Sequence, residues 1–182
     1  MNKKLFEIKI SSEKIFKGKI VELYVDKVKL PNNKIVTREK VTHPGAVCIV
    51  PITKEGKIML VKQFRYPTDS TLLEIPAGKL GSGEDPRNCA ARELKEEIGA
   101  EGGRLIHLAD FYTSPGFCDE LMYLYLALGF EKKENNLEDD EFLEVFELKL
   151  EDAHSFIGSG KIKDAKTIIG ILLARDYLSR FK

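Results

Sequence analysis

The sequence predicts an α/β domain that begins with an antiparallel β arm, and three observations support this fold class. Short alternation of apolar and polar residues, broken by turn residues, runs through residues 6–66 and indicates a meander of β-strands. One helix with clear start and stop signals follows. Further strand-like segments then lead to two helices that close the chain. We therefore expect strands and helices that share one core.

Within the meander, residues 46–53 and 58–66 form two strands joined by the turn at residues 54–57. Gly56 supplies the positive φ that such a turn uses, so we expect the two strands to pair antiparallel. Later strands are expected at residues 105–112, 121–130 and 142–150, separated by the segments SPGFCDE and KKENNLEDDE. The closing helices are expected at residues 151–159 and 164–181.

The first helix is the best defined element of the sequence. Asp85 can cap its free N–H groups, and Pro86 suits its first position, where a missing donor costs nothing. The helix is predicted to end at Ile98, because Gly99 fits a left-handed C-terminal cap. Its core face recurs every four residues at Ala90, Leu94 and Ile98.

The composition narrows the class of protein. A chain of 182 residues is the size of one domain, and Lys plus Arg and Asp plus Glu both number 29. With a formal net charge of zero, no global field favours nucleic acid or an anionic membrane as partner. Three dispersed cysteines, Cys48, Cys89 and Cys118, favour a reduced cytoplasmic location over a disulfide framework or zinc ribbon. No signal-like or membrane-spanning apolar run occurs.

Carboxylates cluster on the first helix. Glu93, Glu96 and Glu97 lie at i, i+3 and i+4 and therefore project from one side, and Glu84 in the preceding loop can fold back toward them. One interpretation is an ordinary solvated acidic face. The other is a partly buried cleft, where mutual repulsion favours a bound divalent cation, and oxygen-only ligands suit Mg²⁺ or Mn²⁺. Spacing alone leaves both interpretations open.

The segment GKLGSGEDPRNCAARELKEEIG, residues 78–99, resembles the complete Nudix box. The matching positions are Gly78, Glu84, the run Arg-Glu-Leu-x-Glu-Glu at residues 92–97, and Gly99. Ala100 is a departure, since the family usually has a larger apolar residue there. The resemblance implies an α/β/α sandwich around a mixed β-sheet. It also implies metal-dependent attack of water on a nucleoside diphosphate that is linked to a further group.

The resemblance implies a role for each matching residue. Arg92 is expected to hold the glutamates by charge-assisted hydrogen bonds, and Glu84 to support the metal shell. The implied Mg²⁺ ligands are Glu93, Glu97, Glu96 and the backbone carbonyl of Ala77.

Other segments are similar to the ADP-ribose pyrophosphatase subfamily, which converts ADP-ribose and water into AMP and ribose 5-phosphate. They are VTREKV, QFRYP, LLEIPAG, SPGF and IKDAKTIIGILLAR. Carried over by position, Arg38 and Arg65 contact substrate, Arg65 through phosphate or the adenine side. Glu120 contacts the terminal ribose, and Pro115 marks the substrate-side SPGF loop. An ordinary turn for SPGF and surface charges for the arginines are the alternatives.

Two further expectations come from the same resemblance. In the acidic loop, Glu141, or Asp139 in its place, orients or deprotonates the attacking water, although a solvated charged turn is the plainer interpretation. Residues 1–43 form the β arm, exchanged in a homodimer, and residues 44–182 form the catalytic domain. Lys19 occupies a position where some relatives place an aromatic residue for adenine stacking.

Three alternatives to ADP-ribose hydrolysis remain. The first is hydrolysis of another nucleotide sugar, such as ADP-glucose or GDP-mannose. The second is a sanitising enzyme for oxidised nucleoside triphosphates, which is generally shorter and lacks the β arm. The third is a sensor that binds ADP-ribose without turnover, but such proteins tend to lack box glutamates and to carry a DNA-binding helical domain, for which this chain has no room.

Overall fold

The computed structural model describes residues 5–133, 135, 137 and 142–180. The chain divides into two compact units. The N-terminal unit consists of Met1–Gly45 and Tyr112–Leu121, and the main unit consists of Ala46–Phe111 and Met122–Lys182. In the part of the chain described, no helix is long and apolar enough to cross a membrane.

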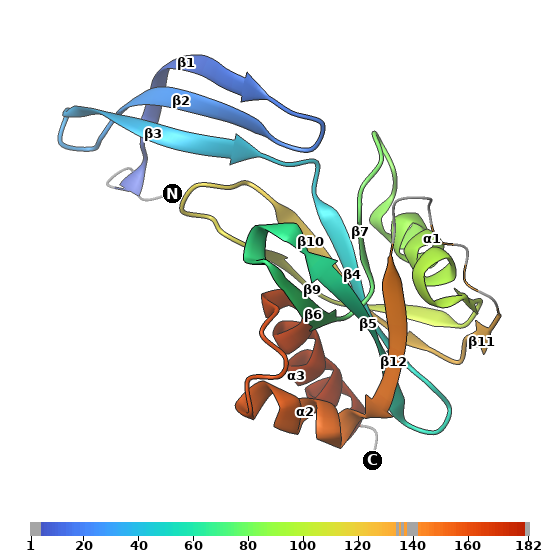
Figure 1. The fold of residues 1–182 in the computed structure, drawn as a ribbon. Helices are drawn as coiled ribbons and strands as arrows, with labels where there is room; N and C mark the ends of the chain where they lie inside the picture. Colours follow the sequence, from blue (N-terminus) through green and yellow to red (C-terminus); the bar gives the residue numbers. More distant parts are fainter. Residues whose placement is uncertain (1–4, 134, 136, 138–141, 181–182) are drawn as a thin grey trace. The chain divides into compact units, whose positions relative to one another are not determined.

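The N-terminal unit is an antiparallel sheet of β1 (Ile8–Lys17), β2 (Glu22–Lys29) and β3 (Ile35–Thr42) (Figure 1). All ten residues of β1 are exposed. Segment Tyr112–Leu121 belongs to this unit because it bonds to the end of β3. The N–H of Val41 donates to the carbonyl of Phe117 at 2.7 Å, and the N–H of Asp119 donates to the carbonyl of Val41 at 3.2 Å.

The main unit is built on a seven-stranded mixed sheet with the strand order β12-β5-β4-β10-β9, in which β6 also pairs with β5 and β7 with β4. Strands β4 and β10 are parallel, whereas β4–β5, β4–β7, β5–β6 and β5–β12 are antiparallel. The strands are β4 (Ala46–Ile52), β5 (Lys57–Arg65), β6 (Ser70–Glu74), β7 (Ala77–Lys79), β9 (Arg104–Tyr112), β10 (Leu121–Leu128) and β12 (Leu143–Lys149). A separate ribbon pairs β8 (Ala100–Glu101) with β11 (Glu131–Lys132).

Helix α1 (Pro86–Ile98) packs on one face of this sheet. The Asp85 carboxylate accepts hydrogen bonds from the N–H groups of Arg87 and Asn88, and Gly99 ends the helix with φ of 65°. Ala90, Leu94 and Ile98 are buried against the sheet. The predicted helix, both of its caps and its core face are therefore confirmed.

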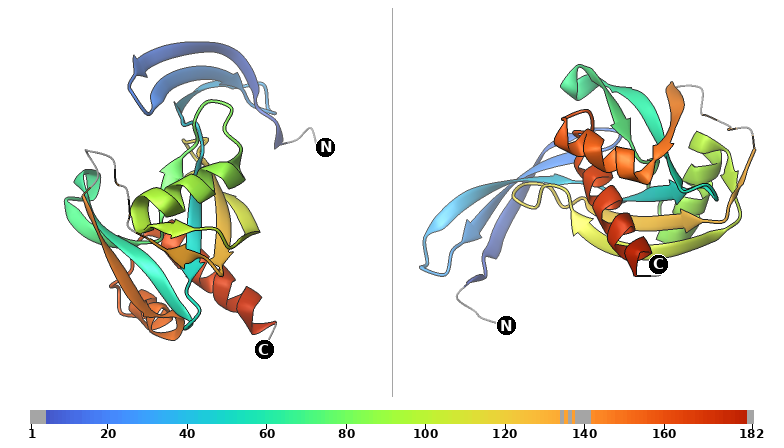
Figure 2. Two further views of the ribbon diagram at one scale, coloured as in Figure 1. Left: turned by 90° about the vertical axis from the view of Figure 1, so that its right-hand side faces the viewer. Right: turned by 90° about the horizontal axis from the view of Figure 1, so that it is seen from below.

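Helices α2 (Leu150–Gly158) and α3 (Ala165–Ser179) cover the opposite face of the sheet (Figure 2). Gly170 lets α3 approach closely, because a Cβ there would lie 2.9 Å from side-chain atoms of both Ile75 and Val50. Helices on both faces of a mixed sheet confirm the predicted α/β sandwich. The antiparallel pairing of the strands at residues 46–53 and 58–66 is also confirmed.

The sequence did not predict an element between the strand at residues 58–66 and α1, yet two strands lie there. A short 3-10 turn, η2 (Tyr66–Thr68), is followed by Asp69 in the left-handed region, and this reversal lets β6 pair with β5. Strand β7 then pairs with β4 opposite Ala46, Val47 and Cys48. Both strands have five residues or fewer, too few for a clear period-2 pattern.

Candidate active site

A close approach between β7 and α1 shapes the site. Gly78 lies so near the helix that an added Cβ would be 1.8 Å from the carboxyl carbon of Glu93. A side chain at this position would require the Glu93 carboxylate to move. The carboxylate of Glu93 is consequently packed directly against the backbone of β7.

Burial distinguishes the two interpretations of the acidic helix face. Glu93 is 7% exposed and Glu97 is 5% exposed, whereas Glu96 is half-buried. Glu97 also accepts a hydrogen bond of 3.1 Å from the backbone N–H of Ala77 in β7. Two nearly buried carboxylates one helical turn apart are not a solvated face, because charges are taken out of water only where they gain a compensating partner.

Arg92 contacts three acidic side chains of residues 78–99. Its guanidinium group contacts Glu93 and Glu96, each at 2.8 Å, and donates to both oxygens of Glu84 at 3.1 and 3.2 Å. The Arg92 bonds and the N–H of Gly81 lower the pKa of the Glu84 carboxyl to about 2. Glu84 therefore stays ionised at neutral pH, and one arginine orients three carboxylates.

Cys89 lies beneath this arginine and is not a candidate nucleophile. Its thiol donates to the carbonyl of Lys79 at 3.4 Å. Burial, aided by the charge of Glu84, raises the pKa of the thiol to about 12. A thiol that stays protonated at neutral pH is a poor nucleophile and a poor metal ligand.

The donor set fits a hard divalent cation in its chemistry. Glu93, Glu97 and Glu96 offer only oxygen atoms, which Mg²⁺ and Mn²⁺ prefer, and the missing side chain of Gly78 leaves room for the Glu93 carboxylate. Among the described residues, no group of three or more His, Cys, Asp or Glu side chains is gathered around one point in a metal-holding arrangement. Substrate oxygens and water are the usual further ligands of Mg²⁺.

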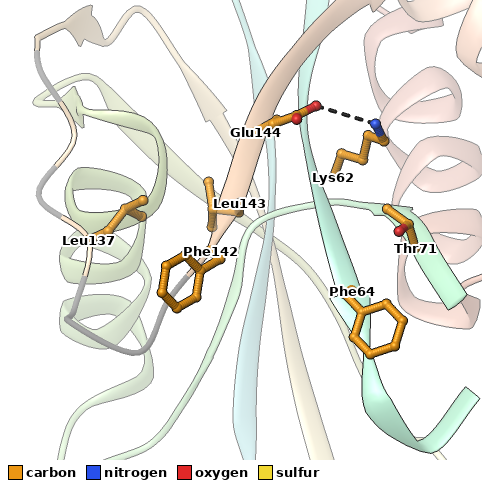
Figure 3. Close-up of a pocket in the computed structure, with 7 residues that line it drawn as sticks. All are labelled: Lys62, Phe64, Thr71, Leu137, Phe142, Leu143 and Glu144. Atoms are coloured by element: carbon orange, nitrogen blue, oxygen red, sulfur yellow. Dashed lines mark hydrogen bonds and ion pairs between the residues drawn. The ribbon is translucent and has the colours of Figure 1, made fainter. Parts of the chain in front are cut away.

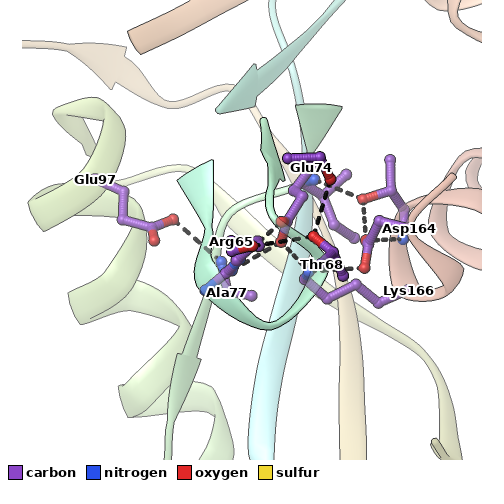
Figure 4. A network of polar contacts seen from close by, with 10 residues as sticks. Arg65, Thr68, Glu74, Ala77, Glu97, Asp164 and Lys166 are labelled. Atoms are coloured by element: carbon purple, nitrogen blue, oxygen red, sulfur yellow. Dashed lines mark hydrogen bonds and ion pairs between the residues drawn. The ribbon is translucent and has the colours of Figure 1, made fainter. Parts of the chain in front are cut away.

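A second network of charges lies beside Glu97 (Figure 4). Arg65, at the end of β5, donates from Nε and Nη2 to the two oxygens of Glu74 in β6, both at 2.8 Å. Lys166 in the first turn of α3 contacts the same carboxylate, and it also pairs with Asp164 at 3.1 Å. The pKa of Arg65 is raised, first by its bond to Glu74 and further by the charges of Glu74 and Glu97. Arg65 is thus within electrostatic reach of Glu97.

Sequence reasoning missed Glu74, Lys166 and Asp164 as members of this network. Burial favours the protonated form of Glu74, but the bond from Arg65 and the charge of Lys166 outweigh it and lower the pKa. One signal was available, since Glu74 is a lone charge within the apolar run LLEIP. A glutamate in such a run is seldom buried unless a cation meets it.

The other predicted substrate residues lie in the N-terminal unit. Arg38 in β3 pairs with Glu7, donating from Nε at 3.1 Å and from Nη2 at 2.6 Å. Glu120 accepts a hydrogen bond of 2.6 Å from the hydroxyl of Thr113 and lies 3.4 Å from Nδ1 of His43. Pro115 begins the turn in which the N–H of Phe117 bonds to Ser114. The roles of Arg38, Glu120 and Pro115 stay predictions.

The acidic candidates Glu141 and Asp139 lie outside the described residues. The start of their segment is attached to the end of α1. The N–H of Lys133 donates to the carbonyl of Gly99 at 2.7 Å, and the side-chain amide of Asn135 donates to the carbonyl of Glu97 at 3.3 Å. The chain that leads to the predicted base thus begins beside a predicted metal ligand.

An open pocket of about 390 Å³ lies elsewhere on the main unit, along β5, β6 and β12 (Figure 3). Its charged residues, Lys62 and Glu144, pair with each other at 3.3 Å. No residue of α1 lines it, so the pocket is not the candidate catalytic site. The lining residues are Lys62, Phe64, Thr71, Leu137, Phe142, Leu143 and Glu144.

Comparison with known proteins agrees with this geometry. A NUDIX domain model matches residues 42–168. A methanol dehydrogenase activator of Bacillus methanolicus is 50% identical over 171 residues, covering 92% of this chain and 92% of that protein. An ADP-ribose pyrophosphatase of Bacillus subtilis (strain 168) is 49% identical over 171 residues, covering 93% and 92%.

A solved structure supports the fold. The crystal structure of an ADP compounds hydrolase aligns with a TM-score of 0.87 over 96% of this chain and 95% of that chain, at 21% identity. Residues 92–97 of the box lie on a capped helix against a mixed sheet, and the domain match covers more than half of the 182 residues. The chain therefore belongs to the Nudix family.

Proposed function

We propose that this protein hydrolyses ADP-ribose to AMP and ribose 5-phosphate, with Mg²⁺ as the working ion and Mn²⁺ as a substitute. The observation that carries the proposal is the pair of nearly buried carboxylates, Glu93 and Glu97, packed against β7 at Gly78. The ADP-ribose pyrophosphatase that is 49% identical over 93% of the chain supports the substrate. The equally similar relative named as a dehydrogenase activator makes a direct substrate comparison necessary.

Each of these residues of the main unit has its own role in the proposed hydrolysis. Glu93, Glu97, Glu96 and the carbonyl of Ala77 would hold the ions, and bound Mg²⁺ would neutralise the diphosphate and activate a water molecule. Arg92 keeps the glutamates in place, and Glu84 keeps Arg92 in place. Arg65 offers a planar cation to the diphosphate. Water adds to one phosphorus, the bridging P–O bond breaks, and a carboxylate such as Glu141 takes the proton of the water.

We also propose that the protein works as a homodimer in the cytoplasm. All of β1 is exposed, including the large apolar residues Ile8, Ile10, Ile15 and Phe16, and an apolar surface of this kind is characteristic of an interface. No disulfide joins the described cysteines, which suits a reducing compartment.

The substrate is tested by steady-state kinetics. We expect Mg²⁺-dependent turnover with kcat/KM highest for ADP-ribose among ADP-ribose, ADP-glucose, GDP-mannose and 8-oxo-dGTP. The substitution Glu97→Gln should lower kcat by at least about a hundredfold, because loss of a metal ligand removes several kcal/mol of transition-state stabilisation.

The matched control for that variant is Glu151→Gln, an exposed carboxylate in the first turn of α2, which should leave kcat unchanged. A preference for GDP-mannose or ADP-glucose would replace ADP-ribose as the substrate and keep the metal site. Binding of ADP-ribose with no turnover of any compound would instead support a sensor.

The close approach at β7 gives a second test. In Gly78→Ala the new methyl group overlaps the Glu93 carboxylate, which must move, and a ligand displaced by about 1 Å is expected to cost about a hundredfold in kcat. Gly158→Ala is the control, since a Cβ at Gly158 meets nothing within 4 Å. Full activity of Gly78→Ala, with an unchanged melting temperature, would contradict the proposed role of Glu93.

The dimer is tested by light scattering coupled to gel filtration. We expect a mass of twice 20.6 kDa at micromolar concentration, because the apolar side chains of β1 would otherwise face water. A mass of 20.6 kDa across the concentration range would remove the dimer from the proposal and leave the chemistry of α1 unaffected.

A further inference from the structure

The orientation of Arg65 is fixed by the buried carboxylate of Glu74. Both oxygens of Glu74 accept from the Nε–Nη2 edge of Arg65 in a bidentate pair. Nη1 takes no part in this pair. The Arg65 side chain is 41% exposed, whereas the Glu74 side chain is 2% exposed. One edge of the guanidinium is therefore held from inside the protein, and the other remains available.

Glu74 is in turn held from a second direction. Lys166 of α3 contacts the same carboxylate, so two cations restrain one buried anion. The start of α3 is attached to the strand end beside Glu74, because the N–H of Ile75 donates to the hydroxyl of Thr167 at 2.8 Å and that hydroxyl donates to Asp164 at 2.5 Å. With these restraints, the carboxylate of Glu74 has little freedom to rotate.

The two cations that meet Glu74 differ in exposure. The Lys166 side chain is only 11% exposed and also pairs with Asp164, as expected of a structural partner. Arg65 is the partly exposed member, and the negative charge of Glu97 acts on it. A guanidinium fixed along one edge and open along the other is suited to bidentate contact with a phosphate.

We propose that Glu74, fixed by Lys166, is a positioning residue that orients the open edge of Arg65 toward the diphosphate of the substrate. This inference rests on the proposed function, since it requires a diphosphate bound beside Glu97. Glu74 and Lys166 act through Arg65 and do not themselves contact substrate. Helix α3, which bears no residue of the Nudix box, thereby contributes to substrate binding.

A double-mutant cycle tests the coupling between Glu74 and Arg65. We compare wild type, Arg65→Ala, Glu74→Gln and the double variant by kcat and KM. If Glu74 works through Arg65, each single substitution should raise KM by about tenfold with kcat changed little, as expected for loss of uniform substrate binding. The double variant should then be no worse than Arg65→Ala alone. Independent effects would multiply to about a hundredfold, and that result would overturn the proposal.

Two further variants separate positioning from stability. Lys166→Met should raise KM in the same way as Glu74→Gln, whereas Ile171→Val, a buried change in α3 outside the network, should lower the melting temperature and leave KM unchanged. Equal KM values for Lys166→Met and wild type would contradict the role of Lys166. The Kd of ADP, measured by calorimetry for wild type and these variants, gives the same comparison without turnover.

The experiments distinguish a wrong substrate from a wrong role for Glu74. If wild type turns over another nucleotide sugar, the cycle is measured on that compound, and the coupling is expected unchanged. If wild type turns over nothing, the cycle is measured on the Kd of ADP. Unaltered ADP affinity in Arg65→Ala would then reject the positioning role by itself.

Discussion

The close approach of β7 to α1 at Gly78 is the constraint on which the rest of the site depends. Because Gly78 has no side chain, the carboxylate of Glu93 packs against backbone, and Glu97 bonds to the N–H of the neighbouring Ala77. Two carboxylates are thereby taken out of water one helical turn apart. Burying two carboxylates destabilises a protein unless a cation compensates their charge. A fold that binds divalent cations uses the same pair, so the packing of β7 on α1 suits the chemistry of the family.

Two arginines compensate for this concentration of negative charge, and each is oriented by carboxylates of its own. Arg92 lies among Glu84, Glu93 and Glu96 at the surface side of α1. Arg65 is restrained from beneath by Glu74, which Lys166 also contacts. The first network holds groups proposed to bind metal, and the second holds a group proposed to bind phosphate. Both use the planar, bidentate geometry that lysine lacks.

The sequence predicted those features of the structure that depend on neighbouring residues in the chain. Asp85, Pro86 and Gly99 delimit α1 through capping chemistry within a few residues, and Ala90, Leu94 and Ile98 define its buried face through period alone. Strands β6 and β7 are too short to show a period, and the Glu74–Lys166 contact joins residues far apart in the chain. Burial of Glu93 and Glu97 also depends on tertiary contact with Gly78. Spacing alone could therefore not distinguish it from a solvated face.

The most direct test of the central claim is divalent-cation binding itself, measured by the electron paramagnetic resonance of free Mn²⁺ in a titration of the protein. We expect wild type to bind Mn²⁺ competitively with Mg²⁺, and Glu93→Gln to bind it at least about tenfold more weakly, since a buried carboxylate ligand is lost. Equal Mn²⁺ affinity in both proteins would mean that the carboxylates buried against β7 do not hold the ion. The proposed metal site on α1 would then be rejected.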